Sequence, residues 1–250
     1  MPNGTTPLLA VLIDADNTSA QWAEAVFEEI ASLGEASVRR IYGDFTNPHL
    51  KSWQTKMAPL ALVPHHQPAN TIGKNSSDIA LVIDAMDILH AGRFDGFVLV
   101  SSDSDFTRLA SRIREQGLDV YGIGQKKTPE AFRKACKRFI YIENLMAAPE
   151  PAEVTEAAGA EPKGRDRAEA TGRKEPAKNA IPLIAAAMRA IGGDEDWYSL
   201  GQIGQYITQA NPDFDTRTYG SSKLSDLMRK TGRFEVKQGQ GNHLVVRDLA

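Results

Sequence analysis

Four aspartates stand where apolar segments give way to loops or helices. Asp14 directly follows the apolar run 8–13, and Asp103 and Asp105 come soon after the apolar run 97–100. Asp78 begins an amphipathic stretch after the polar loop 73–77. Carboxylates that meet at one place repel one another unless a cation lies among them, and hard divalent ions take oxygen ligands. These positions therefore predict a one-metal or two-metal site suited to phosphoryl chemistry.

Each aspartate also has an ordinary structural explanation. Asp is a preferred helix cap, and a carboxylate in the first turn suits the helix dipole, so Asp78 or Asp105 alone is equally well explained as a cap. Asp14 differs, because an Asp directly after six apolar residues weakens a strand unless it has a function. Asp84 and Asp87 face away from Asp78 at about 100° per residue. We expect Asp87 to be solvated and keep Asp84 as a secondary candidate.

Alternating apolar and amphipathic segments must position these aspartates. Strand–helix alternation with continuously apolar strands predicts an α/β fold, in which a mainly parallel sheet is sandwiched by helices. Ligands of such sheets bind at the carboxyl ends of the strands, where the aspartates fall. Strands are predicted at 8–13, 38–42, 60–63, 97–100, 120–123 and 139–142, and helices at 19–33, 49–57, 79–86, 106–115 and 129–137.

Composition divides the chain into two domains. Residues 147–179 are mostly Ala, Glu, Pro, Gly, Lys and Arg, and they cannot bury enough apolar surface to offset the entropy of ordering them. We therefore expect one domain over 1–146, a flexible linker over 147–179 and a second domain over 180–250. In the second domain, three predicted helices precede an alternating segment with a Gly-rich turn over 234–247, which is the pattern of a small winged helix.

Net charge and cysteine content exclude some classes of protein. The net charge of -3 does not indicate a nucleic-acid binder, although bound metals reverse the sign of an acidic site. Cys136 is the only cysteine, which excludes an intramolecular disulfide and a cysteine-based zinc site. We expect Cys136 to be a small buried side chain near a helix end.

No apolar run approaches the ~20 residues of a membrane span. The first residues do not read as a signal peptide, so we expect a cytoplasmic protein.

Three basic side chains lie near the third predicted strand. His65 and His66 follow this strand, and without a Cys or HExxH context we expect them to be a surface feature. Lys74 precedes the helix that Asp78 begins, and it is a candidate contact for a phosphate. A solvated lysine explains it almost as well.

Three motifs in order resemble the NYN family, a branch of the PIN-like nucleases. They are Ile13–Asn17 (IDADN), Lys74–Asp84 (KNSSDIALVID) and Val100–Phe106 (VSSDSDF). The resemblance departs mildly at Ser102, where many members have Gly. It implies a metal-dependent ribonuclease, and it allows a homodimer because PIN-like domains commonly dimerise. In this reading Asp14, Asp78 and Asp103 hold Mg²⁺ or Mn²⁺, and Asn17 and Asp105 complete or orient the site.

The second domain resembles the LOTUS domain, also called OST-HTH. The segment Tyr219–Arg229 and the hairpin after it carry this resemblance, which implies binding of RNA or of a protein partner. The formal charges of this domain nearly cancel, so we expect a modest, salt-sensitive affinity for RNA. Candidate phosphate contacts near the third helix and the wing are Lys223, Arg229, Lys230, Arg233 and Lys237.

Two alternatives share parts of this pattern. Asp14–Thr18 also fits the DxDxT signature of haloacid-dehalogenase-type phosphatases, in which Asp14 is the nucleophile. That fold needs a lysine for which Lys74 is awkwardly placed, and the spacing from Asp14 to Asp103 is short for a capped phosphatase. A non-catalytic RNA-binding scaffold with the same fold is the second alternative. The acidic set is complete, which favours the ribonuclease.

Overall fold

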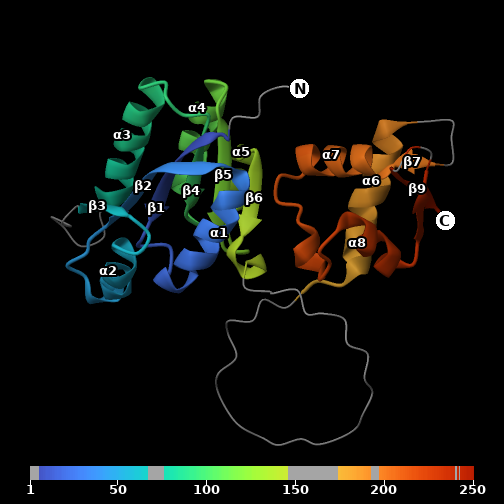
Figure 1. The fold of residues 1–250 in the computed structure, drawn as a ribbon, viewed down its shortest axis with the longest axis horizontal. Helices are drawn as coiled ribbons and strands as arrows, with labels where there is room; N and C mark the ends of the chain where they lie inside the picture. Colours follow the sequence, from blue (N-terminus) through green and yellow to red (C-terminus); the bar gives the residue numbers. More distant parts are fainter. Residues whose placement is uncertain (1–5, 67–75, 146–173, 193–196, 240, 242) are drawn as a thin grey trace, which may run out of the picture.

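A computed structural model describes residues 6–66, 76–145, 174–192, 197–239, 241 and 243–250 (Figure 1). The first domain is built on a six-stranded sheet in the order β3-β2-β1-β4-β5-β6, and every pairing is parallel. The predicted α/β fold with a parallel sheet is thus confirmed. The strands are β1 (Leu8–Asp14), β2 (Glu35–Gly43), β3 (Val63–His66), β4 (Gly96–Val100), β5 (Asp119–Gly124) and β6 (Arg138–Tyr141).

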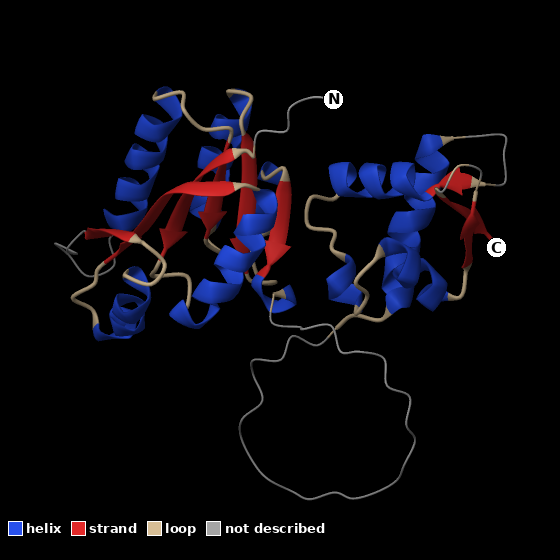
Figure 2. Cartoon of the chain, in the orientation of Figure 1, coloured by secondary structure: helices blue, strands red, loops and turns tan. Residues whose placement is uncertain are grey.

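Helices cover both faces of this sheet (Figure 2). The helices α1 (Ala23–Leu33) and α2 (Lys51–Met57) lie on one face. On the other face lie α3 (Ser76–His90), α4 (Thr107–Glu115) and α5 (Glu130–Ala135). Strand β1 is buried on both sides, which explains its continuous apolar run. Short 3-10 helices are formed by Ala20–Trp22, Pro48–Leu50, Ser104–Phe106 and Ile142–Asn144.

The third strand begins later than the sequence predicts. It spans Val63–His66 rather than 60–63, because the residues before it form a turn in which Ala61 has a left-handed backbone with φ of 52°. His65 and His66, which were expected after the strand, are therefore its last two residues. His65 pairs with Tyr42 of β2, and the centroids of their rings are 5.0 Å apart.

The second domain is a small winged helix with its own core. Its helices bury Ile184, Ile203 and Leu227 against Val246 of a three-stranded antiparallel sheet in the order β7-β9-β8. The expected linker lies outside the described residues as far as residue 173. No helix in the described part of the chain is long and apolar enough to span a membrane. The elements are the 3-10 helix Ala177–Ala180, α6 (Ile181–Ile191), β7 (Tyr198–Ser199), α7 (Leu200–Ala210), the 3-10 helix Thr216–Tyr219, α8 (Leu224–Thr231), β8 (Phe234–Gln238) and β9 (Leu244–Asp248).

The two domains contact each other along the edge strand β6. The backbone N–H of Phe139 donates to the carbonyl of Pro212 at 2.8 Å, so the second domain pairs part of an edge that would otherwise be open. Asn144 Nδ2 donates to Thr218 Oγ1 at 2.9 Å, and both side chains are buried. These bonds connect main chain and buried side chains of both domains, so the contact is a specific one.

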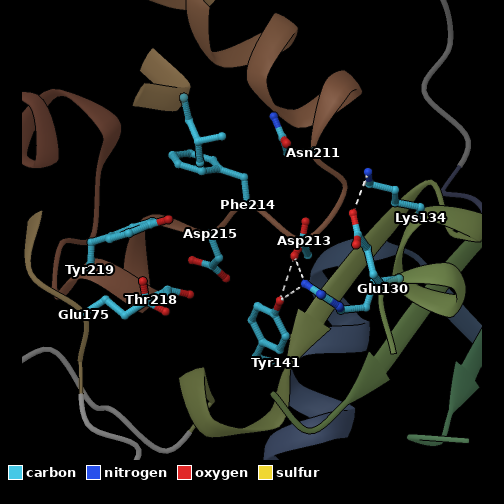
Figure 3. A pocket seen from close by; sticks show the side chains of 12 residues that line it. Glu130, Lys134, Tyr141, Glu175, Asn211, Asp213, Phe214, Asp215, Thr218 and Tyr219 are labelled. Carbon is cyan, nitrogen blue, oxygen red and sulfur yellow. Dashed lines mark hydrogen bonds and ion pairs between the residues drawn. The ribbon is translucent and has the colours of Figure 1, made fainter. Parts of the chain in front are cut away.

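Charged side chains continue the same interface. Arg133 of α5 and Tyr141 of β6 both donate to Asp213, which follows α7. Figure 3 shows Tyr141 and Asp213 pointing toward each other across the boundary. Arg217 forms a two-pronged ion pair with Glu29 of α1, at 2.8 Å and 3.1 Å. The interface therefore adds ion pairs between the domains to charges that also have partners within their own domain, Asp215 for Arg217 and Arg138 for Glu29.

Candidate acidic site

Asp14, the last residue of β1, is buried and surrounded by hydrogen-bond donors. Its Oδ2 accepts from Ser101 Oγ at 2.7 Å and from Asn17 Nδ2 at 2.8 Å. Its Oδ1 accepts from the backbone N–H groups of Asp16 and Asn17, both at 3.2 Å. Burial raises the pKa of Asp14, and the bonds from Ser101 and Asn17 oppose this rise because they favour the charged form. The carboxylate is therefore held in one orientation.

Ser101 joins the acidic ends of two neighbouring strands. β1 and β4 run side by side with Ile13 opposite Val100, so the residues after each strand meet. Ser101 Oγ donates to Asp14 and accepts from the backbone N–H of Asp103 at 3.0 Å. These bonds unite two of the three predicted metal ligands in one hydrogen-bonded group.

Asp103 and Asp105 lie at the start of the helical segment after β4. Asp103 Oδ1 accepts from the backbone N–H of Asp105 at 2.9 Å and caps the short 3-10 helix there. Asp103 is partly buried and Asp105 is exposed. The capping role that the sequence allowed for Asp105 thus falls to Asp103. A carboxylate can cap a helix and still offer a second oxygen to a ligand.

Asp78 brings the third segment to the same edge of the sheet. It lies in the first turn of α3 and is half-buried. Burial first, and then the charges of Asp14 and Asp103, raise the pKa of Asp78 to about 6. Ser77 Oγ donates to Asp16 Oδ2 at 2.9 Å and ties the start of α3 to the loop after β1. Carboxylates from three distant segments therefore share one electrostatic environment.

This donor set suits a hard divalent cation, since all its members are oxygen ligands. Among the described residues, no three His, Cys, Asp or Glu side chains stand in a ready-made metal-binding arrangement. The carboxylates form instead a zone of mutual repulsion, and a cation placed in that zone would lower the pKa of Asp78. The residues that could hold such an ion are Asp14, Asp78 and Asp103.

Asp84 and Asp87 do not belong to this group. Asp84 accepts hydrogen bonds from Arg40 and Tyr42 of β2, and His65 lies 3.9 Å from it. It therefore connects α3 to the sheet. Asp87 is exposed, as the helical spacing predicts.

The predicted phosphate contacts of the second domain are spread over its surface. Arg229 pairs with Asp226 at 3.3 Å, whereas Arg233 forms two bonds to Asp248, at 2.8 Å and 2.7 Å. Such pairs lower the net charge that the two arginines offer to RNA. The other predicted side chains of this domain are Lys223, which is exposed; Lys230, which donates to the carbonyl of Gly220 at 2.5 Å; and Lys237, which lies 3.5 Å from the ring centroid of Trp197. Lys74, the candidate phosphate contact of the first domain, lies outside the described residues.

Two features of the acidic edge escaped the sequence analysis. Ser101 was not singled out, although it directly follows a predicted strand as Asp14 does. Lys126 and Lys127 also follow a strand, β5, and Gln125 beside them donates its backbone N–H to Ser102 Oγ at 2.9 Å. The rule that locates the aspartates at the carboxyl ends of strands would have located these residues too.

A parallel sheet with acidic side chains at its carboxyl edge defines an α/β domain of the PIN-like type. The NYN domain family matches residues 8–143, more than half of the chain, and the chain belongs to this family of PIN-like nucleases. The OST-HTH/LOTUS domain, a type that binds RNA or protein partners, matches residues 174–246.

Two solved structures are similar to parts of the chain. One is the crystal structure of a protein of unknown function from Vibrio parahaemolyticus, with 20% identity and a TM-score of 0.48 over 58% of this chain and 98% of that one. The other is the solution structure of an uncharacterized protein from Nitrosomonas europaea, with 28% identity and a TM-score of 0.26 over 38% of this chain and 93% of that one. The chain has no match among the curated proteins.

Replacing Asp78 by Asn is expected to stabilise the metal-free protein. The pKa of Asp78 is raised from its ordinary value of 3.8 to about 6 in the folded protein. The protein therefore loses folding stability as the pH rises from 3.8 toward about 6, because the carboxyl must then ionise in the folded state. Because solvent screens the half-buried Asp78, we expect a gain of roughly 1 kcal/mol for Asp78→Asn at neutral pH. Thermal unfolding in EDTA should show a rise in Tm of about 3 °C at neutral pH and little change near pH 4. An equal rise at both pH values would contradict this origin.

Replacing Ser101 by Ala is expected to weaken both the fold and the site. The variant leaves buried Asp14 without its shortest bond and the N–H of Asp103 without its acceptor. We expect a loss of about 1–2 kcal/mol in the free energy of unfolding, measured by urea denaturation. Ser102→Ala is the matched control, since Ser102 bonds only the neighbouring loop among its described contacts. A Ser101→Ala variant as stable as Ser102→Ala would show that Ser101 does not support Asp14.

Proposed function

We propose that the chain is a metal-dependent ribonuclease that hydrolyses phosphodiester bonds of RNA, and that its second domain engages RNA or a partner. The observation that carries this proposal is the meeting of carboxylates from three segments at the carboxyl edge of the sheet, where burial and then the charges of Asp14 and Asp103 raise the pKa of Asp78. Membership of the NYN family supports the same reaction. Isolated helix caps would not explain why the three segments converge.

The side chains at this edge have separate roles in the proposal. Asp14, Asp78 and Asp103 hold Mg²⁺ or Mn²⁺, and Ser101 and Asn17 orient Asp14 through the bonds to its Oδ2. When bound, such an ion supplies positive charge that stabilises the negative charge developing on the scissile phosphate.

Residues around these ligands act on the rest of the substrate. Asp105 is exposed beside Asp103 and can accept a hydrogen bond from a water molecule that approaches the phosphate. Lys126 and Lys127, on the loop after β5, provide positive charge near the acidic edge for the neighbouring phosphates of the RNA.

A cleavage assay with the full chain tests this proposal. End-labelled single-stranded and hairpin RNAs are incubated with Mn²⁺, Mg²⁺ or EDTA, and a phosphomonoester is offered in parallel. We expect cleavage of RNA with a divalent ion, none in EDTA, and no phosphomonoester hydrolysis. RNA that is bound and never cut would overturn the proposal in favour of a binding scaffold. Hydrolysis of the phosphomonoester alone would identify a phosphatase with Asp14 as nucleophile.

A further inference from the structure

A groove lies between the two domains, far from the acidic edge. It has a volume of about 750 Å³ and is lined by α4, β5, α5 and β6 on one side and by α7 and the turn after it on the other. Lys137 and Arg138 stand where β6 begins, whereas the acidic site lies where parallel strands end. Since β5 has six residues, the two places are about 20 Å apart.

The groove has a strongly one-sided charge. Four of its lining side chains are cations, namely Arg114, Lys134, Lys137 and Arg138, and none is a carboxylate. A second interdomain pocket, of about 320 Å³, is lined by four carboxylates, Glu130, Glu175, Asp213 and Asp215, and by two cations, Arg133 and Lys134, of which Lys134 also lines the groove (Figure 3). A polyanion is therefore favoured in the groove over that pocket.

The cations of the groove keep donors for a ligand. Lys137 pairs with Asp119 at 2.5 Å, but its side chain is 53% exposed and an ammonium has three donors. Arg138 lies at 3.5 Å from Glu29, a carboxylate that Arg217 already binds through two shorter bonds. Arg114 contacts the backbone carbonyls of the residues before Lys137, at 3.3 Å and 3.4 Å. Lys134 pairs with Glu130 at 2.6 Å, but its side chain is 61% exposed. Each of the four cations can therefore add a bond to a phosphate oxygen.

The opposite wall offers neutral hydrogen-bonding groups. Gln205 and Gln209 are exposed and lie four residues apart on α7, so they share one face of that helix. Side-chain amides both donate and accept, and they bind phosphates, sugars and base edges in nucleic-acid complexes. A cationic wall facing an amide wall suits a phosphodiester chain better than a small apolar ligand.

We propose that this interdomain groove binds the backbone of single-stranded RNA at a distance from the acidic edge, with phosphates on Lys134, Lys137 and Arg138 and amide contacts from α7. This inference rests on the proposed function, because the RNA held here is the flank of the RNA cut at the acidic edge. The groove is complete only when both domains are docked, so it gives the second domain a role in substrate selection. RNAs that reach both sites bind more tightly than RNAs that reach one.

The test is binding of RNA to the full chain in EDTA, where no cleavage occurs. Fluorescence anisotropy is measured with an oligonucleotide of about 20 nucleotides and one of about 5. We expect Lys134→Gln/Lys137→Gln to weaken binding of the longer RNA about tenfold and to lower its salt slope by about 2. Lys56→Gln is the matched control, since Lys56 also pairs with a carboxylate at 2.5 Å, and it should bind as the wild type does.

The second wall has its own test. Gln209→Glu places a negative charge on the α7 side and should weaken binding of the longer RNA, whereas Gln202→Glu, exposed on the same helix outside the groove lining, should not. Unchanged binding by both groove variants overturns this inference, even if the wild type cleaves RNA. Conversely, weakened binding by both variants upholds the groove even if no RNA is cut with Mn²⁺, an outcome that would overturn only the proposed function.

Discussion

Asp103→Asn is expected to reduce RNA cleavage by at least about a thousandfold while leaving the fold intact. Asp103 is a proposed metal ligand whose charge contributes to the repulsion at Asp78, so an amide removes both a ligand and an anion. The contribution of Asp103 to the fold does not depend on its charge, because its Oδ1 accepts only a backbone N–H among its described bonds. The carbonyl oxygen of Asn accepts that bond equally well and is itself a preferred cap.

The effects of Asp103→Asn on activity and on stability can therefore be measured separately. Multiple-turnover cleavage with Mn²⁺ measures the activity. Urea denaturation measures the free energy of unfolding, which we expect to change by no more than about 0.5 kcal/mol. Asp87→Asn is the matched control, since Asp87 is an exposed aspartate of α3 and should keep full activity. Near-normal cleavage by Asp103→Asn would show that this carboxylate is only a cap. A large loss of stability would show that the fold depends on its charge.

The sequence predicts the parallel sheet and the covering helices of the first domain because their apolar patterns follow from burial. Strands such as 97–100 are buried on both faces, so their apolar runs are visible without any partner. Asp14 and Asp103 could be placed at one edge because parallel strands bring their carboxyl ends together. The third strand was misplaced because 60–63 is as apolar as a strand, while the left-handed backbone at Ala61 has no sequence signal.

The details of the acidic edge depend on side-chain orientation, which no spacing rule supplies. Ser101 looks like an ordinary loop serine until the register of β1 and β4 places it 2.7 Å from Asp14. The role of Asp84 is similarly hidden, because its partners Arg40 and Tyr42 lie on a strand more than forty residues earlier. Helical spacing could separate Asp84 from Asp78 but could not show what Asp84 binds.

The contact between the domains was invisible for a related reason. Glu29 lies on an amphipathic helix and reads as a solvated residue, yet its side chain is only 12% exposed. Its partner Arg217 is 188 positions further along the chain, across the segment expected to be a flexible linker. Composition describes what a linker can bury, whereas the interface depends on the surfaces of the domains that the linker joins.

Arg217→Ala is expected to separate the two domains. The guanidinium of Arg217 binds both Glu29 and Asp215, whose side chains are 12% and 9% exposed. Burial lowers the pKa of Arg217, but the two carboxylates outweigh it and raise the pKa, so the cation is firmly held. Removing it leaves Glu29, on the other domain, without its two shortest bonds, which should weaken the interface by about 3 kcal/mol.

Cleavage of the linker makes this loss measurable. With a protease site inserted within residues 147–173, the halves of the wild-type chain should co-elute in gel filtration after cutting, and those of Arg217→Ala should elute apart. Glu29→Gln tests the same pair from the first domain, where it leaves the core of the second untouched. Arg229→Ala, which breaks an exposed pair within α8, is the matched control and should co-elute. If the wild-type halves separate at once, the linker alone holds the domains together. If the Arg217→Ala halves still co-elute, the Phe139–Pro212 and Asn144–Thr218 bonds hold the domains together without the ion pairs.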